Sequence, residues 1–526
     1  MKSKTHKPTV ETPQKKVPLK TCLTNIFFAA FSGILLFLSF PKFGSGWLAW
    51  IALIPLFYAL NRVTKVSHGL LLGFVAGIVS SVGIFYWIAY VIVMYGHLPL
   101  SVGLALMLLL ACYLSLYISM FAGSLVFLLN AMPLYLAAPV LWVCFEYGKS
   151  IIITGFPWAN LGYSQYLNSY LIQFADIAGV FGLSFLIILV NAVFWEVIHK
   201  KSKKVLILAG AVGVLLVVIV AYGFYRIDRV IEIVRNSPEL EVSLIQGNID
   251  QSIKWNDSYQ RETLNIYEQL SLKNTPGPES LIVWPETAAP FKFQDNSVLR
   301  DQIINLAVQT KSWLMFGSVS YAQNENRMDF YNSAYLLSPA GEVRDRYDKV
   351  HLVPYGEYVP LRKLMPFVEG FTEGIGDFST GKGFYPLSMN AHKIGVLICY
   401  EGILAPAARA YKNHAAELLV NITNDAWFGD TSAPFQHFSM AVLRAVETRL
   451  YLVRAANTGI SGIVDPTGKI IAATGIFQED ALKGIVKFVK IPTLHDRFGD
   501  LIVAFCFGLA VCFFIISFRR RNQKCL

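Results

Sequence analysis

Charged residues are scarce in this sequence. Asp, Glu, Lys and Arg make up only 15% of the 526 residues, hydrophobic residues make up 54%, and the mean hydropathy is +0.48. A chain this long and this apolar is not a wholly soluble globular protein. The apolar residues are concentrated between about residues 24 and 225 and again at 501–518, whereas residues 227–498 have the composition of a soluble domain.

Signatures of several common enzyme classes are absent. The chain contains no G-x-S-x-G, no G-x-x-x-x-G-K-[ST], no paired C-x-x-C and no H-x-x-x-H. Serine-hydrolase, nucleotide-hydrolase and metalloenzyme functions therefore have no support from a motif. We expect neither a cofactor nor a metal.

Eight apolar segments are candidates for membrane helices, each of which needs about 20 residues to cross a bilayer. They lie near residues 24–41, 47–61, 69–92, 101–129, 134–149, 171–198, 204–225 and 500–518. The first is not a cleavable signal peptide, because no small-residue cleavage site follows FFAAFSGILLFLSF. The pattern predicts a polytopic α-helical membrane domain.

Positive charge is concentrated in three short windows. Residues 1–20, 200–204 and 519–524 carry net charges of +5, +4 and +4, whereas the whole chain carries +10. Such windows mark cytoplasmic segments beside membrane helices, not a nucleic-acid-binding surface. With an even number of spans, both termini are cytoplasmic and the soluble domain is exported. The predicted division is a cytoplasmic tail (1–23), a membrane domain (24–226), an exported domain (227–498), a final membrane helix (499–518) and a second cytoplasmic tail (519–526).

Cysteine is rare in the predicted exported domain. Of the seven cysteines in the chain, only Cys399 lies there, which excludes an internal disulfide framework. Thiols in an oxidising compartment tend to be paired or lost, so a lone retained thiol favours a reactive role. The alternative is that Cys399, at the end of the apolar run KIGVLI, is a small core residue.

The exported domain alternates short apolar runs with helical segments. This alternation predicts a layered α/β domain with buried sheets, in which reactive groups gather where strands end. Helices are expected at 296–310, 403–415 and 434–450. Strands are expected in EVSLIQGNI, SLIVWP, WLMFGSVSY, NSAYLLS, KIGVLIC, AELLVNIT, YLVRAANTG, SGIVDP and GIVKFVKI.

Three strand ends carry groups that could work together. Glu286 follows a strand in LIVWPET, Lys349 and Glu357 lie in RYDKVHLVPYGEYVP, and Cys399 ends VLIC. A thiol with a pKa near 8.5 is mostly protonated, so a nucleophilic cysteine needs a base to take its proton and a cation to favour the thiolate and the oxyanion. A Cys–His dyad using His437 or His351 is the alternative; hydrogen-bonded structural roles suit these histidines better.

The motifs WPET, DKVHLVPYGEYVP and CYEG resemble the Glu-Lys-Cys signatures of the nitrilase, or carbon–nitrogen hydrolase, superfamily. The membrane segments make the sequence most similar to its membrane-embedded branch, the apolipoprotein N-acyltransferase family. Further segments that carry this resemblance are FPKFGSGWLAWIALIPL, GFPWANLGYSQ, QGNIDQSIKW, NITNDAWFGD and RAANTGISGIVDPTG. The resemblance implies a four-layer αββα sandwich beside about eight membrane helices.

The resemblance also implies residue roles. Glu286 corresponds to the general base, Lys349 to the oxyanion-stabilising group and Cys399 to the nucleophile that forms a thioester. Supporting or substrate-binding roles fall to Glu357, Tyr400, Glu401, Trp255 and Trp427.

Substrates and location follow from the same resemblance. The acyl donor would be a membrane phospholipid, typically phosphatidylethanolamine. The acceptor would be the α-amino group of the lipidated N-terminal cysteine of an apolipoprotein, in the final step of bacterial lipoprotein maturation. These expectations place the chain in the bacterial inner membrane with a periplasmic catalytic domain, in contact with membrane lipids and without a nucleic-acid partner.

Two other functions remain open at this stage. A membrane-tethered amidase would use the same triad with water as the acceptor, and a non-enzymatic scaffold would have lost a triad residue. Residues 360–371, PLRKLMPFVEGF, are expected to form either a lid that dips into the membrane or an ordinary loop over the sheet.

Overall fold

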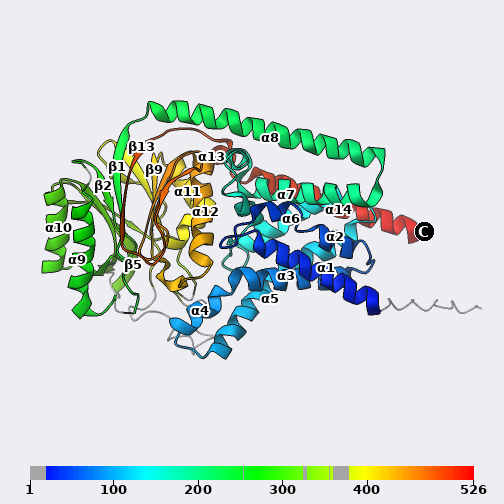
Figure 1. Cartoon of the computed structure of the whole chain (residues 1–526), viewed down its shortest axis with the longest axis horizontal. Coiled ribbons are helices and arrows are strands. Elements are labelled where there is room, and N and C mark those ends of the chain that lie inside the picture. Colours follow the sequence, from blue (N-terminus) through cyan, green and yellow to red (C-terminus); the bar gives the residue numbers. More distant parts are fainter. Residues whose placement is uncertain are drawn as a thin grey trace, which may run out of the picture.

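A computed structural model describes residues 19–252, 254–275, 277–323, 328–354, 356–358 and 378–525. A helical bundle and a domain with two β-sheets lie side by side, and the long helix α8 (Lys203–Arg235) runs from the far end of the bundle back to the sheets (Figure 1). At about 1.5 Å per residue, its 33 residues are longer than a bilayer core requires.

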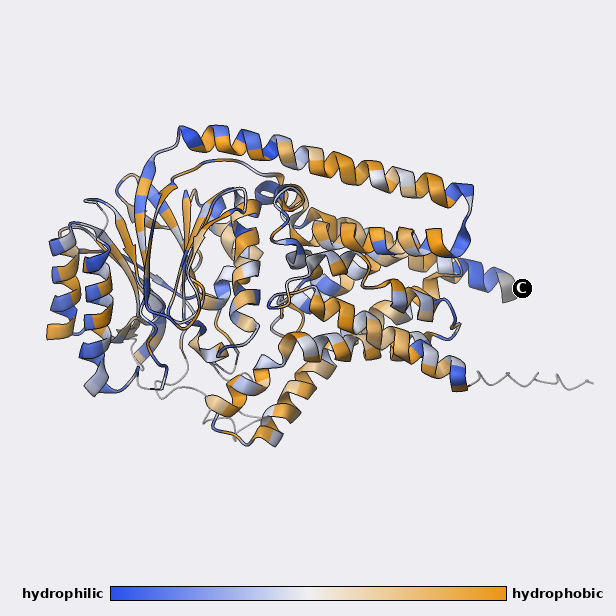
Figure 2. Ribbon diagram, in the orientation of Figure 1, coloured by the Kyte–Doolittle hydropathy of each residue, from blue (hydrophilic) through white to orange (hydrophobic). Residues whose placement is uncertain are grey.

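The bundle is built from hydrophobic helices, and hydrophilic residues gather at both ends of α8 (Figure 2). Besides α8, its α-helices are α1 (Leu19–Leu38), α2 (Ile54–Leu60), α3 (Val66–Phe85), α4 (Trp87–Met94), α5 (Leu100–Leu128), α6 (Leu134–Ile151), α7 (Ala175–Lys200) and α14 (Leu501–Cys525). Short 3₁₀ turns lie at Gly46–Trp50, Leu161–Gln165 and Ile172–Phe174.

Six helices of the described part are long and apolar enough to span a membrane, which makes this a membrane protein. They account for six of the eight predicted spans. The predicted span 47–61 forms a 3₁₀ turn followed by α2, and together these cover only Gly46–Leu60. The predicted span 134–149 forms α6, whose last turns carry Glu146 and Lys149. The exact count of eight therefore stays a prediction.

The second part contains two sheets. The larger has the order β13-β1-β2-β4-β5-β6, with β3 paired to β4, and the smaller has the order β12-β11-β10-β9-β8-β7. The strands are β1 (Glu239–Gln246), β2 (Leu281–Val283), β3 (Ala289–Lys292), β4 (Trp313–Gln323), β5 (Met328–Leu337), β6 (Val343–Asp348), β7 (Leu387–Met389), β8 (His392–Ile398), β9 (Leu418–Thr423), β10 (Tyr451–Ala456), β11 (Gly462–Val464), β12 (Ile470–Ala473) and β13 (Asp480–Lys487).

Helices cover the outer faces of both sheets and complete the expected αββα sandwich (Figure 1). α9 (Asp257–Lys273) and α10 (Val298–Thr310) lie on the side away from the bundle, whereas α11 (Ala405–Asn413) and α12 (Ala433–Thr448) lie between the smaller sheet and the bundle. Alternate residues of a strand face opposite cores: Leu281 and Val283 pack in the core that includes the second sheet, and Ile282 packs in the core under α9 and α10.

The segment patterns missed one long helix and four short or polar strands. α9 and β6 are rich in polar residues, and β3, β7 and β12 have only three or four residues each, too few to show a hydrophobic period. Each of the nine strands and three helices that were predicted has a counterpart in the structure.

A buried ion pair and a buried hydrogen bond fix the sandwich to the bundle. Arg449, just after α12, donates to Asp176 at the start of α7 (Nη2–Oδ2, 2.8 Å), and Arg226 of α8 reaches the same carboxylate oxygen (Nε–Oδ2, 2.7 Å). Arg444 of α12 donates to the hydroxyl of Tyr163 (3.0 Å). Removing one partner of such a buried pair typically costs about 3–5 kcal/mol, so these contacts hold the two parts in one arrangement.

Candidate active site

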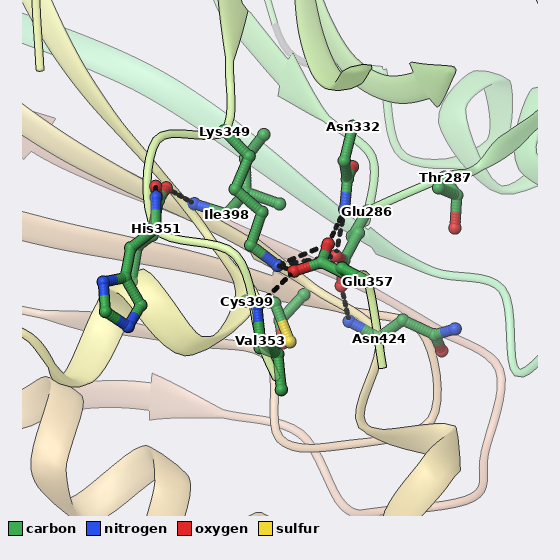
Figure 3. A network of polar contacts seen from close by, with 12 residues as sticks. Glu286, Thr287, Asn332, Lys349, His351, Val353, Glu357, Ile398, Cys399 and Asn424 are labelled. Carbon is green, nitrogen blue, oxygen red and sulfur yellow. Dashed lines mark hydrogen bonds and ion pairs between the residues drawn. The ribbon is translucent and has the colours of Figure 1, made fainter. Parts of the chain in front are cut away.

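The residues proposed for catalysis come from neighbouring strand ends. Glu286 lies just beyond β2, Lys349 directly follows β6, and Cys399 directly follows β8. β8 runs parallel to β9, after which Asn424 follows. Figure 3 shows the side chains of Glu286, Lys349, Glu357 and Cys399 brought together from these segments. The sheet arrangement thus gathers groups that are spread along the sequence from Glu286 to Cys399.

Lys349 lies between two carboxylates and is 1% exposed. Its Nζ is 2.9 Å from Glu357 and 3.6 Å from Oε1 of Glu286. Burial would lower the pKa of Lys349, but Glu357 and then Glu286 outweigh burial and raise it above its usual range. The side chain is therefore a fixed ammonium group, suited to stabilising an anion and unable to serve as a base.

The Glu286 carboxylate is held by hydrogen bonds at both oxygens. Nδ2 of Asn332, on β5, donates to Oε1 (2.8 Å), and the backbone N–H of Asn424 donates to Oε2 (2.9 Å). Nδ2 of Asn332 also donates to Oε1 of Glu357 (2.8 Å), so one amide sets the distance between the two carboxylates. Glu357 accepts a further bond from the backbone N–H of Val353 (2.9 Å).

Cys399 has a left-handed backbone conformation, with φ = 51°, which is uncommon for a residue with a side chain. Burial raises the pKa of its thiol, and the nearby Glu286 raises it further, although Lys349 opposes this effect. The resting side chain is consequently a thiol, not a thiolate. Nucleophilic attack by this sulfur requires a neighbouring group that accepts its proton.

Glu401 connects the segment that carries Cys399 to the segment that carries Lys349. Its carboxylate accepts the backbone N–H of Ile398 (2.8 Å) on one side and those of Val350 (2.8 Å) and His351 (2.9 Å) on the other. Burial raises the pKa of Glu401 to about 7, and Lys349 and the three N–H groups limit the rise. Glu401 thus positions the sulfur and the ammonium relative to each other.

Tyr400 lies in an aromatic stack at the boundary with the bundle. Its ring lies parallel to that of His351 (centroids 5.6 Å apart) and stacks on that of Trp158 (6.3 Å). Trp158 belongs to the loop between α6 and α7 and is itself held by Gln436, which accepts from its Nε1 (2.8 Å). Aromatic side chains therefore form the wall between the candidate nucleophile and the bundle.

The histidine alternative finds no thiol contact among the described residues. Nε2 of His437 lies 3.2 Å from the carbonyl oxygen of Cys399, and its Nδ1 lies 3.0 Å from Oδ1 of Asp425. His351 uses its backbone N–H for Glu401 and its ring for the stack on Tyr400. Both histidines contact the nucleophile segment without a hydrogen bond to Sγ, as expected of structural groups.

The two tryptophans expected near the substrate lie in different settings. Trp427 is partly buried, and its ring meets that of Tyr95, just after α4, at a centroid distance of 4.8 Å. Trp255 lies in the turn before α9, and within the described residues its buried Nε1 has no hydrogen-bond partner. The expected lid at 360–371 lies outside the described residues.

Sequence reasoning missed Asn332 and Asn424, which together hold the Glu286 carboxylate. Asn332 begins the run NSAYLLS, and Asn424 follows the run AELLVNIT. The only signal in the sequence was an amide side chain at the edge of each apolar run. That signal does not reveal that both residues contact the Glu286 carboxylate. In the described part of the chain, no group of three or more His, Cys, Asp or Glu side chains could hold a metal ion.

Comparisons with known proteins agree with this architecture. Residues 32–193 match the apolipoprotein N-acyltransferase N-terminal domain, and residues 241–491 match the carbon–nitrogen hydrolase domain. An apolipoprotein N-acyltransferase of Geobacter metallireducens is 45% identical over 94% of this chain and 95% of its own length. This chain belongs to the apolipoprotein N-acyltransferase family.

Other members of the apolipoprotein N-acyltransferase family are similar along nearly the whole chain. The Haemophilus influenzae protein is 32% identical over 95% of this chain and 96% of its own. An amidase from Nesterenkonia sp., 19% identical, aligns with 51% of this chain and 96% of its own, with a TM-score of 0.36. Membership of the N-acyltransferase family makes this membrane protein an enzyme, an acyltransferase that acts in lipoprotein N-acylation.

Proposed function

We propose that this enzyme moves an acyl chain from a membrane phospholipid, through a thioester on Cys399, to the α-amino group of the lipidated N-terminal cysteine of apolipoproteins. One observation supports these residue roles. The protonated thiol of Cys399 lies near the ammonium group of Lys349 and near the Glu286 carboxylate, which is hydrogen-bonded at both oxygens. Lys349 has its charge fixed by Glu357, which leaves Glu286 as the proton acceptor.

In the first half-reaction, Glu286 takes the proton of the Cys399 thiol, and the sulfur attacks the ester carbonyl of the phospholipid. The negative charge passes to the carbonyl oxygen, which Lys349 and the backbone N–H of Tyr400 stabilise. Collapse of this intermediate breaks the ester C–O bond. The lysophospholipid oxygen leaves with the proton from Glu286, and the acyl chain stays on sulfur.

In the second half-reaction, the neutral α-amine of the acceptor attacks the thioester carbonyl. Glu286 takes the amine proton, the same donors stabilise the oxyanion, and the C–S bond breaks. Glu286 returns the proton to the departing sulfur, so the products are an amide and the free thiol. Because the acyl chain waits on the enzyme, the two lipid substrates need not occupy the site together.

We assign the donor as phosphatidylethanolamine and the location as the bacterial inner membrane with a periplasmic catalytic domain. The arrangement of the helix ends supports this orientation: the start of α1, the start of α8 and the end of α14 lie at the end of the bundle away from the sandwich (Figure 1). These are the ends beside the three basic windows of the sequence. Positive charge of this kind is retained in the cytoplasm.

Transfer to an amine requires that water stay out of the thioester site. The aromatic wall of Tyr400, Trp158 and His351 and the helical bundle behind it support a water-poor environment. A membrane-tethered amidase would need water to reach the same carbonyl. The position of the site against the bundle therefore favours acyl transfer over hydrolysis.

The experiment uses the full-length enzyme in vesicles that contain phosphatidylethanolamine with a radiolabelled acyl chain. A synthetic diacylglyceryl-cysteine peptide is added, and the label in peptide and in free fatty acid is measured. We expect label on the α-nitrogen of the peptide and little free fatty acid. Release of fatty acid with no labelled peptide would support the amidase instead, and vesicles with phosphatidylglycerol as the only donor test the headgroup.

A further inference from the structure

Two polar side chains contact the carbonyl oxygen of Cys399. Nε2 of His437 approaches its oxygen at 3.2 Å, and Nδ2 of Asn421 donates to the same oxygen at 3.4 Å. Cys399 needs such support because its φ of 51° is unfavourable for a residue with a Cβ atom. Asn421 also donates to the carbonyl oxygen of Leu397 (2.8 Å), so it holds both sides of the strand end.

Both of these groups are fixed by one buried guanidinium. Arg454 on β10 is fully buried and donates to Oδ1 of Asn421 and to Oδ2 of Asp425 (2.8 Å). Asp425 in turn faces Nδ1 of His437 and accepts from Oγ1 of Thr423 (3.1 Å). Arg454, Asp425 and His437 form a rigid polar chain that ends at the Cys399 carbonyl.

The two ring nitrogens of His437 meet different partners. Burial and then Arg454 lower the pKa of His437, so the ring is neutral. Nη2 of Arg454 lies 3.1 Å from Nδ1 and can donate to it. Nδ1 also faces Oδ1 of Asp425 (3.0 Å), so it meets both a donor and an acceptor. Among the described residues Nε2 meets the carbonyl oxygen of Cys399, to which it donates in the ring form that carries the proton on Nε2.

In a trans peptide the C=O and N–H bonds lie in one plane and point in opposite directions. The carbonyl of Cys399 and the N–H of Tyr400 belong to the same peptide. Because the Cys399 carbonyl points toward His437, the Tyr400 N–H points away from His437. A hydrogen bond accepted by the carbonyl also polarises the peptide and strengthens its N–H as a donor.

We propose that His437 is a positioning residue for the oxyanion site and acts on the Tyr400 N–H through the Cys399–Tyr400 peptide. This inference rests on the proposed function, because it assumes that an oxyanion forms beside Tyr400. His437 takes no proton from the thiol. The contacts support separate roles for His437 as a positioning residue and Glu286 as the proton acceptor. The ring of His437 faces the backbone oxygen of Cys399, while Glu286 lies beside the sulfur.

The test compares His437→Gln with His437→Met, two side chains of similar length of which only glutamine offers an N–H donor. The control is His414→Met, which removes a similar ring-to-carbonyl bond, 3.0 Å to the oxygen of Phe384, at a distant position. Two rates are measured in vesicles: acylation of Cys399 by labelled phospholipid, and alkylation of its thiol by iodoacetamide from pH 6 to 10. Alkylation forms no oxyanion, so it reports the thiol alone.

We expect His437→Met to slow acylation about 10- to 100-fold, somewhat less than the loss of a whole oxyanion donor. His437→Gln should recover much of that loss, and neither variant nor the control should change the pH profile of alkylation. The inference is overturned if His437→Met acylates at the wild-type rate, if Gln and Met are equally slow, or if the alkylation profile shifts. Failure of the wild type itself to acylate would instead refute the proposed function.

Discussion

The hydroxyl of Tyr95 donates a hydrogen bond, 2.8 Å long, to the carbonyl oxygen of Ala426. Tyr95 directly follows the helix α4 of the bundle, and Ala426 lies two residues after Asn424, whose N–H holds the Glu286 carboxylate. A second bond runs from the N–H of Ser432 to the hydroxyl of Tyr86 (3.0 Å). The bundle therefore sets the position of a loop that touches the proposed base.

We predict that Tyr95→Phe slows acylation of Cys399 about 2- to 10-fold, the equivalent of one net hydrogen bond of roughly 0.5–1.5 kcal/mol. The ring of phenylalanine keeps the contact with Trp427, so any decrease in the acylation rate is due to removal of the hydroxyl group alone. The matched control is Tyr113→Phe, which removes a hydroxyl bond to the carbonyl oxygen of Ile152 in the bundle. Equal acylation rates for both variants would show that the α4 contact has no catalytic effect.

Glu286→Gln tests the proposed base. The amide keeps the shape of the side chain but cannot accept the thiol proton, so we expect acylation to fall about 10²- to 10⁴-fold while the protein stays folded and inserted. Rates are measured with labelled phospholipid in vesicles, and Glu262→Gln, on the exposed face of α9, is the control. An active Glu286→Gln beside a His437 variant that has lost thiol reactivity would restore the Cys–His alternative.

The pKa of Glu401 predicts a pH dependence of stability. Its native pKa of about 7 lies above the usual glutamate value of 4.5, so the native state holds this proton up to a higher pH than the unfolded state. The contribution is complete below about pH 4.5 and is lost as pH rises through about 7. The melting temperature of the wild type, relative to Glu401→Gln, should therefore decline over that range.

That difference is measured by thermal unfolding in detergent at pH 4.5 to 8, with both proteins in the same buffers. Other titrating groups are common to the two proteins and cancel in the difference. A difference that stays constant across the range would mean that Glu401 is ionised throughout and that its three N–H partners outweigh burial.

Orientation is tested with a reporter that is active only outside the cytoplasm. We expect activity when it is fused after Gly402 and no activity when it is fused after Leu526, because the basic residues beside α14 keep that end in the cytoplasm. The opposite pattern would contradict the periplasmic placement of the catalytic domain.

The parts predicted from sequence share a local signal. Cys399, Glu286 and Lys349 each stand at or just after a strand end, and the packing of the two sheets brings these ends of β8, β2 and β6 together. Asn332, Arg454 and Asp425 depend on contacts between strands far apart in the chain, which no local period encodes. The hydrophobic runs likewise located the helices but did not reveal the break at Tyr86 between α3 and α4. That break directs α4 toward the sandwich (Figure 1).

In the proposed mechanism, Cys399 carries the acyl chain between two half-reactions. The most direct measurement incubates the enzyme with labelled phospholipid alone and locates the label by mass spectrometry of proteolytic peptides. We predict one acyl group on Cys399, released by hydroxylamine or by acceptor peptide, and none in Cys399→Ala; Cys399→Ser should be nearly inactive, because a hydroxyl is a weaker nucleophile. Labelled product that forms only with both substrates present, without any acyl group on Cys399, would contradict the account.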